Sequence, residues 1–182
     1  GGKMRNLLGL SIAAVVLASV AHPAGAVVET RYQRAQGGVV CKLTDLTLNT
    51  SVRAKATGFR NEGTTGTFAI CGMESANSQE AIGTITGLTM GLYSFNGVAT
   101  TISCTAVNGY ANSTPIYATK SMTTSASGTF VSLNFDASDF GGTAGDPLAQ
   151  NDYWSVTCNL PAKTAVGFMT SQFNVNTPAP PA

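Results

Sequence analysis

The stretch that decides the fold is Tyr153-Trp154-Ser155-Val156-Thr157-Cys158-Asn159-Leu160, in which apolar and polar residues alternate. A period of two is typical of a half-buried strand in an antiparallel sheet, where one face meets the core and the other meets water. Trp154 is in phase with Val156 and Cys158, so we expect its ring in the core. Tyr153 has the opposite phase and should point outward.

The same alternation recurs in short runs separated by Gly, Asn, Ser or Pro. The apolar positions that share one face are Val39, Cys41 and Leu43; Leu46, Leu48 and Val52; Leu88, Met90 and Leu92; Ile102, Cys104 and Ala106; and Val131, Leu133 and Phe135. No segment after the first 26 residues has a helical stripe with caps. About eight or nine short strands at this spacing predict an all-β fold, either a sandwich or a barrel. We favour an antiparallel β-sandwich of immunoglobulin-like or jelly-roll-like shape.

The first 26 residues have the pattern of a secretory signal peptide. Arg5 precedes the apolar run 7–20, and Ala24-Gly25-Ala26 has the small residues of a cleavage site. The apolar run is shorter than the about 20 residues that a membrane-spanning helix needs. Gly1–Lys3 precede the first methionine and are interpreted as added or upstream-translated residues. We therefore expect secretion to the periplasm or the extracellular space.

Four cysteines, Cys41, Cys71, Cys104 and Cys158, would then enter an oxidising compartment and form disulfides. We favour the pairs Cys41–Cys71 and Cys104–Cys158, because each keeps a bridge within one half of the chain. The strand phase points the last two sulfur atoms into the core, where their bond could join two facing sheets. The layout would therefore be a disulfide-stapled sandwich. However, the residue two before Cys158 is not the tyrosine of immunoglobulin domains, so membership of that family is not indicated.

Residues 27–175 are expected to form one domain, since their number suits a single core. A break near Asn77–Glu80 into two small domains is the alternative. Residues 176–182, rich in Pro and Ala, predict a flexible tail. The stretch 81–119 contains no charged residue, and its glycines at 83, 87 and 91 are better explained by a strand with bends than by a membrane helix.

Composition excludes several function classes. Charged residues make up 10% of the chain, and loss of Lys3 and Arg5 with the leader would shift the net charge from +1 to −1. Such a nearly neutral domain has little long-range attraction for nucleic acid. The only histidine, His22, lies in the leader, so histidine-dependent triads and zinc sites would be lost on export. We expect no enzyme, with a carboxylate-dependent hydrolase as the remaining catalytic possibility.

Two groups of residues are candidate binding sites. Four acids, Asp136, Asp139, Asp146 and Asp152, fall in a Gly-rich stretch whose oxygens could bind calcium, although turn-forming aspartates explain the pattern more simply. Three tyrosines, Tyr110, Tyr117 and Tyr153, could stack on sugar rings or lie at sheet edges with their hydroxyls in water. We expect no other cofactor.

Assembly is the other candidate activity, since uncharged Thr-rich and Val-rich edges lack the lysines that block strand addition. The basic residues gather early in the chain and the aspartates late. This charge asymmetry would favour head-to-tail contacts between copies of the chain; the alternative is that it arises by chance in a small number of charges. The layout is similar to that of small exported all-β domains, including subunits of surface filaments. We therefore expect a non-catalytic protein that binds or assembles at the cell surface. Its partner would be a surface glycan or another copy of the chain, and a carbohydrate-binding module is the first alternative.

Overall fold

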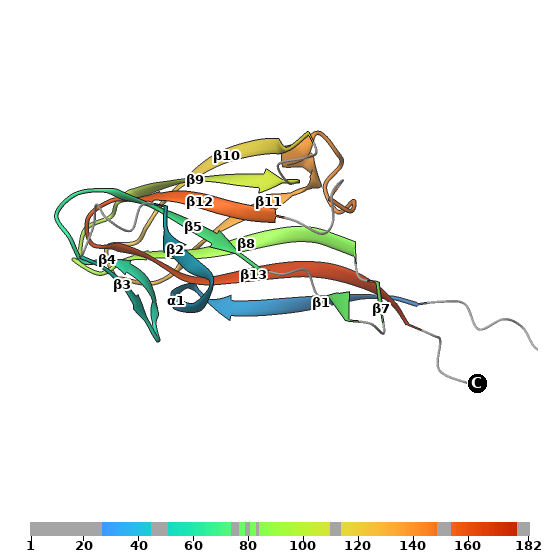
Figure 1. Cartoon of the computed structure of the whole chain (residues 1–182), viewed down its shortest axis with the longest axis horizontal. Coiled ribbons are helices and arrows are strands. Elements are labelled where there is room, and N and C mark those ends of the chain that lie inside the picture. The colour runs from blue at the N-terminus through green and yellow to red at the C-terminus, as the bar shows by residue number, and fades with distance from the viewer. Residues whose placement is uncertain are drawn as a thin grey trace, which may run out of the picture.

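Two antiparallel sheets lie face to face and form a β-sandwich (Figure 1). The computed structural model describes residues 27–44, 51–73, 77–78, 81–82, 84–109, 114–148 and 154–177. Sheet A contains β1 (Val27–Gln36), β3 (Val52–Lys55), β4 (Gly58–Asn61), β8 (Thr84–Ser94), β11 (Val131–Asp136) and β13 (Thr164–Thr177). Sheet B contains β2 (Cys41–Leu43), β5 (Thr67–Gly72), β9 (Thr101–Asn108), β10 (Ile116–Thr123) and β12 (Trp154–Leu160). The remaining elements are the strand pair β6 (Asn77–Ser78) and β7 (Ala81–Ile82), the helical turn α1 (Gly37–Val40) and the 3-10 helix η1 (Ala137–Phe140).

The long strands β8 and β13 form the centre of sheet A, whose order is β11-β8-β13-β4-β3. The edge of β13 opposite β8 pairs with β4 at Ala165 and Val166, and with β1 over residues 168–177. Sheet B has the order β10-β9-β12-β5-β2. Each sheet therefore combines strands from both halves of the chain in one sandwich.

The apolar positions that recur with a period of two in the sequence are core positions in the structure. The predicted all-β sandwich is confirmed. The buried residues on one face of each strand are Leu88, Met90 and Leu92 in β8; Ile102, Cys104 and Ala106 in β9; Leu133 and Phe135 in β11; and Trp154, Val156, Cys158 and Leu160 in β12. Trp154 is thus a core residue, as its phase predicted. Leu46 and Leu48 lie outside the described residues.

Val39 is an exception to the predicted pattern. It lies in α1 and is 82% exposed, so it does not share a strand face with Cys41. The chain must cross here from sheet A to sheet B, and it passes so close to β13 that a Cβ at Gly37 would meet the Val166 carbonyl oxygen at 2.1 Å. The crossing replaces the expected strand by a helical turn, whose path depends on glycine.

Both predicted disulfides, Cys41–Cys71 and Cys104–Cys158, are confirmed, and all four sulfur-bearing side chains are buried. The expectation that the second bond joins two facing sheets is wrong. Each bond joins directly paired residues on neighbouring strands of sheet B, β2 with β5 and β9 with β12. Their Cα atoms are 4.0 Å apart, whereas packed sheets lie about 10 Å apart. A cysteine that points into the core can bond to a neighbouring strand of its own sheet or to the facing sheet, and the alternation in the sequence does not distinguish these two geometries.

The predicted strand around Gly87 and Gly91 is confirmed as β8. At the other end of the domain, β13 continues to Thr177, so Asn176 and Thr177 belong to the sheet rather than to the predicted tail. Residues 178–182 and the predicted leader lie outside the described residues. Within the described part of the chain, no helix has the length and apolarity needed to cross a membrane.

Candidate functional site

Four aromatic rings form a row on the outer side of sheet A. Tyr93 is in β8, Phe95 follows that strand, Phe130 precedes β11 and Phe168 is in β13. Successive ring centroids are 6.2 Å apart for Phe95 and Tyr93, 5.0 Å for Tyr93 and Phe130, and 5.5 Å for Phe130 and Phe168. The last two pairs meet edge to face. Such pairs attract by about 0.5–1.5 kcal/mol each beyond the area they bury, so the row is a continuous packed unit.

A β-bulge turns Phe168 outward. β8 pairs Leu92 with Val166 and Gly91 with Phe168, which leaves Gly167 as the extra residue in β13. Val166, before Gly167, and Met169, after Phe168, both pack in the core. The ring of Phe168 between them therefore faces away from the core. Bulges commonly redirect a side chain in this way.

Two glycines provide the space that the outer rings occupy. A Cβ at Gly91 would lie 2.2 Å from the ring of Phe168, and one at Gly167 would lie 2.1 Å from the ring of Phe130. Carbon atoms do not approach this closely, so a side chain at either position would displace a ring. The row therefore requires glycine at both positions.

Two arginines flank the row. The Arg34 guanidinium from β1 lies 4.7 Å from the centroid of Phe168. The Arg60 guanidinium from β4 lies 5.6 Å from the centroid of Tyr93 and 5.2 Å from that of Phe95. Cation–π contacts of this kind contribute about 0.5–1 kcal/mol at exposed sites. We call Arg34, Arg60 and the four rings together the arginine–aromatic face.

Hydrogen bonds fix both guanidinium groups through one nitrogen each. Nε of Arg60 donates to the Tyr93 hydroxyl at 2.8 Å, and that hydroxyl donates to the Thr57 carbonyl at 3.2 Å. Nε of Arg34 donates to Oγ1 of Thr170 at 3.1 Å. Within the described residues, neither arginine forms an ion pair with a carboxylate, and neither donates a hydrogen bond through its Nη groups. Among the residues that the structure describes, the Nη donors of both side chains are therefore unused.

The rings differ in their access to solvent. Phe130 is 53% exposed, Phe95 and Phe168 are half-buried, and Tyr93 is buried between them. Tyr93 therefore positions its neighbours, while Phe130 presents a ring to the outside. Next to the row, Oγ1 of Thr89 donates to Oδ1 of Asn134 at 2.8 Å, so polar groups continue the surface. Exposed rings beside guanidinium groups can stack on a flat apolar surface and bind carboxylates or other oxyanions.

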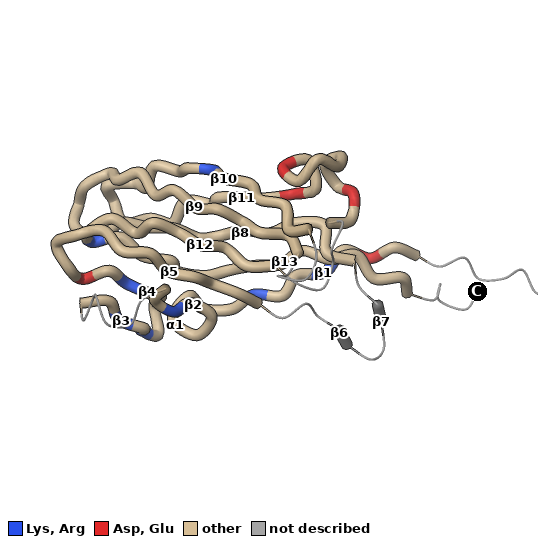
Figure 2. The backbone as a smooth tube through the Cα atoms, turned by 45° about the horizontal axis from the view of Figure 1, so that its top comes forward, with Lys and Arg blue, Asp and Glu red and all other residues tan. Residues whose placement is uncertain are grey.

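Of the three predicted sugar-binding tyrosines, the structure places one. Tyr117 is on β10 at the outer face of sheet B and is 63% exposed, whereas Tyr110 and Tyr153 lie outside the described residues. Tyr117 is therefore on the opposite sheet from the arginine–aromatic face. Its neighbours on that face are mostly hydroxyl-bearing, including the hydrogen-bonded pair Thr105 and Thr119. Figure 2 shows β9 and β12 without a charged residue along their lengths.

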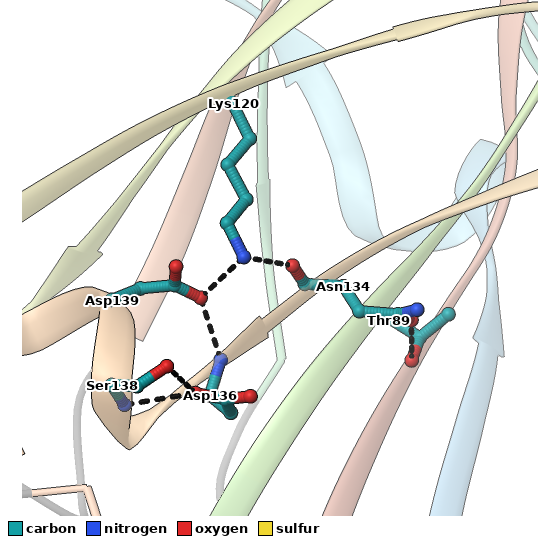
Figure 3. Close-up of polar contacts among 6 residues, drawn as sticks. All are labelled: Thr89, Lys120, Asn134, Asp136, Ser138 and Asp139. Carbon is teal, nitrogen blue, oxygen red and sulfur yellow. Dashed lines mark hydrogen bonds and ion pairs between the residues drawn. The ribbon is translucent and has the colours of Figure 1, made fainter. Parts of the chain in front are cut away.

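Two members of the predicted aspartate cluster, Asp136 and Asp139, lie at η1 (Figure 3). Oδ2 of Asp139 accepts from Lys120 Nζ at 2.7 Å and from the Asp136 N–H at 2.9 Å. Oδ1 of Asp136 accepts from the Ser138 N–H and hydroxyl, and these hydrogen bonds lower the pKa of Asp136. Both carboxylates thus cap η1.

Asp146 lies on the exposed loop after η1, and Asp152 is outside the described residues. No group of three or more potential metal ligands occurs in the described part of the chain. Lys120 instead neutralises one carboxylate of the cluster. The calcium site stays a prediction.

Sequence reasoning missed the arginine–aromatic face, although it noted that the basic residues gather early in the chain. The only local signal is glycine beside an aromatic residue, as in Gly167-Phe168. That signal does not reveal which distant residue the ring meets. The face exists only through the pairing of β13 with β8 and through the bulge within it.

Comparisons with known proteins assign no family: no family model and no curated protein matches the chain significantly. Among solved structures, a family two carbohydrate esterase from Cellvibrio japonicus is similar with a TM-score of 0.42 and 10% identity, over 85% of this chain. This chain spans only 37% of that esterase. A family 11 carbohydrate-binding module from Clostridium thermocellum, solved with a mixed-linked tetrasaccharide, is similar with a TM-score of 0.35 and 10% identity, over 88% of this chain and 92% of that one. At these scores the likeness assigns neither a family nor a function to this chain.

Proposed function

We propose that this chain is a secreted, non-catalytic protein that binds acidic carbohydrate through the arginine–aromatic face. The observation that carries the proposal is the pair of guanidinium groups without a carboxylate partner among the described residues, at the two ends of a partly exposed row of rings. The ligand class follows from the two kinds of contact that this face offers.

The rings favour a carbohydrate ligand. The C–H face of a sugar ring is flat and apolar, and its hydroxyls remain free to contact water or polar side chains. Phe130 offers an exposed ring, and Thr89 and Asn134 offer polar groups beside it. An aromatic ring also loses little conformational entropy on binding, because few of its torsions are freely rotating.

The arginines favour an acidic ligand. A guanidinium presents a planar set of donors that matches a carboxylate, and such charged hydrogen bonds are roughly twice as strong as neutral ones. Arg34 and Arg60 are already held by Nε and by their ring contacts, so little side-chain entropy remains to be lost. Uronic acid residues carry both the ring and the carboxylate.

The aspartate pair supports a non-catalytic role. A glycosidase needs a carboxylic acid with a raised pKa as its proton donor. Hydrogen bonds from Ser138 lower the pKa of Asp136, so this group is ionised at neutral pH. Its neighbour Asp139 is bound to Lys120. Neither group suits the role of general acid.

The test is affinity electrophoresis of the purified protein in gels that contain a polyuronate, a neutral glucan or a sulfated glucan. We expect retardation by the polyuronate and none by the neutral glucan. Arg34→Gln with Arg60→Gln should weaken binding at least about tenfold, since one charged hydrogen bond contributes about 1.5–3 kcal/mol. Equal migration in all three gels would contradict the proposal, and stronger retardation by the sulfated glucan would reassign the anion.

The outer face of sheet B is a second candidate, favoured by the exposed rings of Tyr117 and Phe68 beside strands without charge. It would suit a neutral glycan. Tyr117→Ala and Phe130→Ala form a matched pair, because each removes an exposed ring from one sheet only. Loss of binding in Tyr117→Ala alone would move the site to sheet B.

A further inference from the structure

The strand β1 is long, regular and poorly buried. All ten of its residues pair with β13 in continuous register, yet only Ala35 packs against the core. Val27, Val28 and Tyr32 are 50%, 62% and 66% exposed. Figure 1 shows β1 at the margin of sheet A, beside β13.

The second edge of β1 is open within the part of the chain that the structure describes, where β13 is its only paired strand. Native proteins usually protect such an edge with proline, lysine or a bulge, because its N–H and C=O groups can pair with another strand. β1 contains neither proline nor lysine, and its register with β13 has no bulge. Its charged side chains are Glu29, Arg31 and Arg34, which include both signs of charge. It retains the full hydrogen-bonding capacity of a sheet edge.

We infer that β1 pairs antiparallel with β1 of a second copy of this chain, about a two-fold axis at Thr30. Antiparallel partners place directly opposite residues on the same face of a sheet, and a two-fold axis perpendicular to the sheet preserves that face. In such a dimer, an odd-numbered residue must lie opposite an odd-numbered residue, and an even-numbered residue opposite an even-numbered one. The axis must therefore pass through one residue position.

The side chains select Thr30 as that position. This register places Glu29 opposite Arg31 of the second copy twice, and Val28 opposite Tyr32 twice. Glu29 and Arg31 already form an ion pair 2.9 Å apart within one strand, so the four side chains would alternate in sign. Opposite charges and aromatic–β-branched pairs both stabilise neighbouring strands.

The neighbouring registers are worse. An axis at Arg31 would place two guanidinium groups directly opposite each other, and like charges in that position are destabilising. An axis at Tyr32 would bring the two Tyr32 rings together in one pair, but it would place Glu29 opposite Ala35 and Val28 opposite Gln36. Both charge pairs and both aromatic–β-branched pairs would then be lost. The Thr30 register also pairs residue 27 with residue 33, so it uses the strand from its first residue.

The symmetry has a consequence for binding. Arg34 and Tyr32 lie on the same side of β1, and Arg34 contacts Phe168 on the outer side of sheet A. Joining two such sheets edge to edge keeps both outer sides on one surface. If the proposed function holds, one dimer presents two arginine–aromatic faces to the same polymer, and linked sites gain avidity without any new contact. The pairing itself does not depend on that function.

The test is cysteine cross-linking of the purified protein, combined with light scattering after size exclusion. The described native cysteines are all in disulfides, so an introduced cysteine supplies the reactive thiol. We expect a dimer that Thr30→Cys links covalently on oxidation or with a short bis-maleimide, and that Tyr32→Cys links poorly. A monomer at all concentrations overturns the inference, and so does a dimer that Tyr32→Cys links more efficiently than Thr30→Cys.

Charge exchange provides the second measurement. Arg31→Glu should raise the dimer dissociation constant about tenfold, because two attractive cross-strand pairs become repulsive. Glu29→Arg with Arg31→Glu should restore it, since the pairs are then attractive again. Failure of the double variant to recover would overturn the register. Loss of glycan binding with an intact dimer would instead reject the proposed function alone.

Discussion

Gly91→Ala tests whether the arginine–aromatic face is a packed unit of the fold. The new methyl carbon would lie 2.2 Å from the ring of Phe168, which must then move. That movement breaks the contact of Phe168 with Phe130 and the cation–π contact with Arg34. Together these losses amount to about 1–2.5 kcal/mol, and overpacking in general costs about 1–3 kcal/mol.

Gly87→Ala is the matched control on the same strand. There the nearest atom to the new carbon is the Phe135 carbonyl oxygen at 3.6 Å, an ordinary contact. Such a replacement should be neutral or should stabilise the protein by about 0.4–1 kcal/mol, because it restricts the unfolded chain. Urea denaturation of both variants gives the two free energies of unfolding. The reasoning is refuted if Gly91→Ala is as stable as Gly87→Ala.

Two further predictions concern stability. Replacing Cys104 and Cys158 together by alanine should lower the free energy of unfolding by roughly 4 kcal/mol, measured by urea denaturation; a loss below about 1 kcal/mol would argue against the chain-entropy account of this bond. Hydrogen bonds from Ser138 lower the pKa of Asp136 in the folded protein below its value in the unfolded chain. The stability that this carboxylate contributes is therefore complete above about pH 4, and it is lost as the pH falls through the folded pKa. Asp136→Asn should therefore show a smaller loss of stability between about pH 5 and pH 2 than the wild type does, measured by thermal unfolding across that range, and an unchanged pH profile would contradict the assignment.

Much of the fold was predictable because buried residues alternate with less buried ones along β9, β11 and β12. That property is local, and the sequence displays it as a period of two. The strand β1 was not predicted for the converse reason. It has no buried face and is held through its backbone, so Val27–Gln36 shows no hydrophobic period.

The candidate site was less predictable than the fold. Tyr117 was named as a candidate ring for sugar stacking and is exposed on sheet B, and its role in binding stays a prediction. The arginine–aromatic face, by contrast, joins segments that are far apart in the chain. Its geometry depends on one extra residue in β13, Gly167, which reverses the direction of Phe168 relative to a regular strand. A shift of one residue in register moves a side chain to the other face, and no local pattern reports it.

The most direct test of the central claim is amide chemical-shift mapping of the protein during titration with a short uronic acid oligosaccharide. Binding at the arginine–aromatic face predicts that the largest shifts occur around Arg34 in β1, in β4, at the end of β8, at the start of β11 and in residues 165–170 of β13. The shifts should be absent in the variant that carries Arg34→Gln and Arg60→Gln. Largest shifts in β9, β10 and β12, or no shifts at saturating oligosaccharide, would contradict the account.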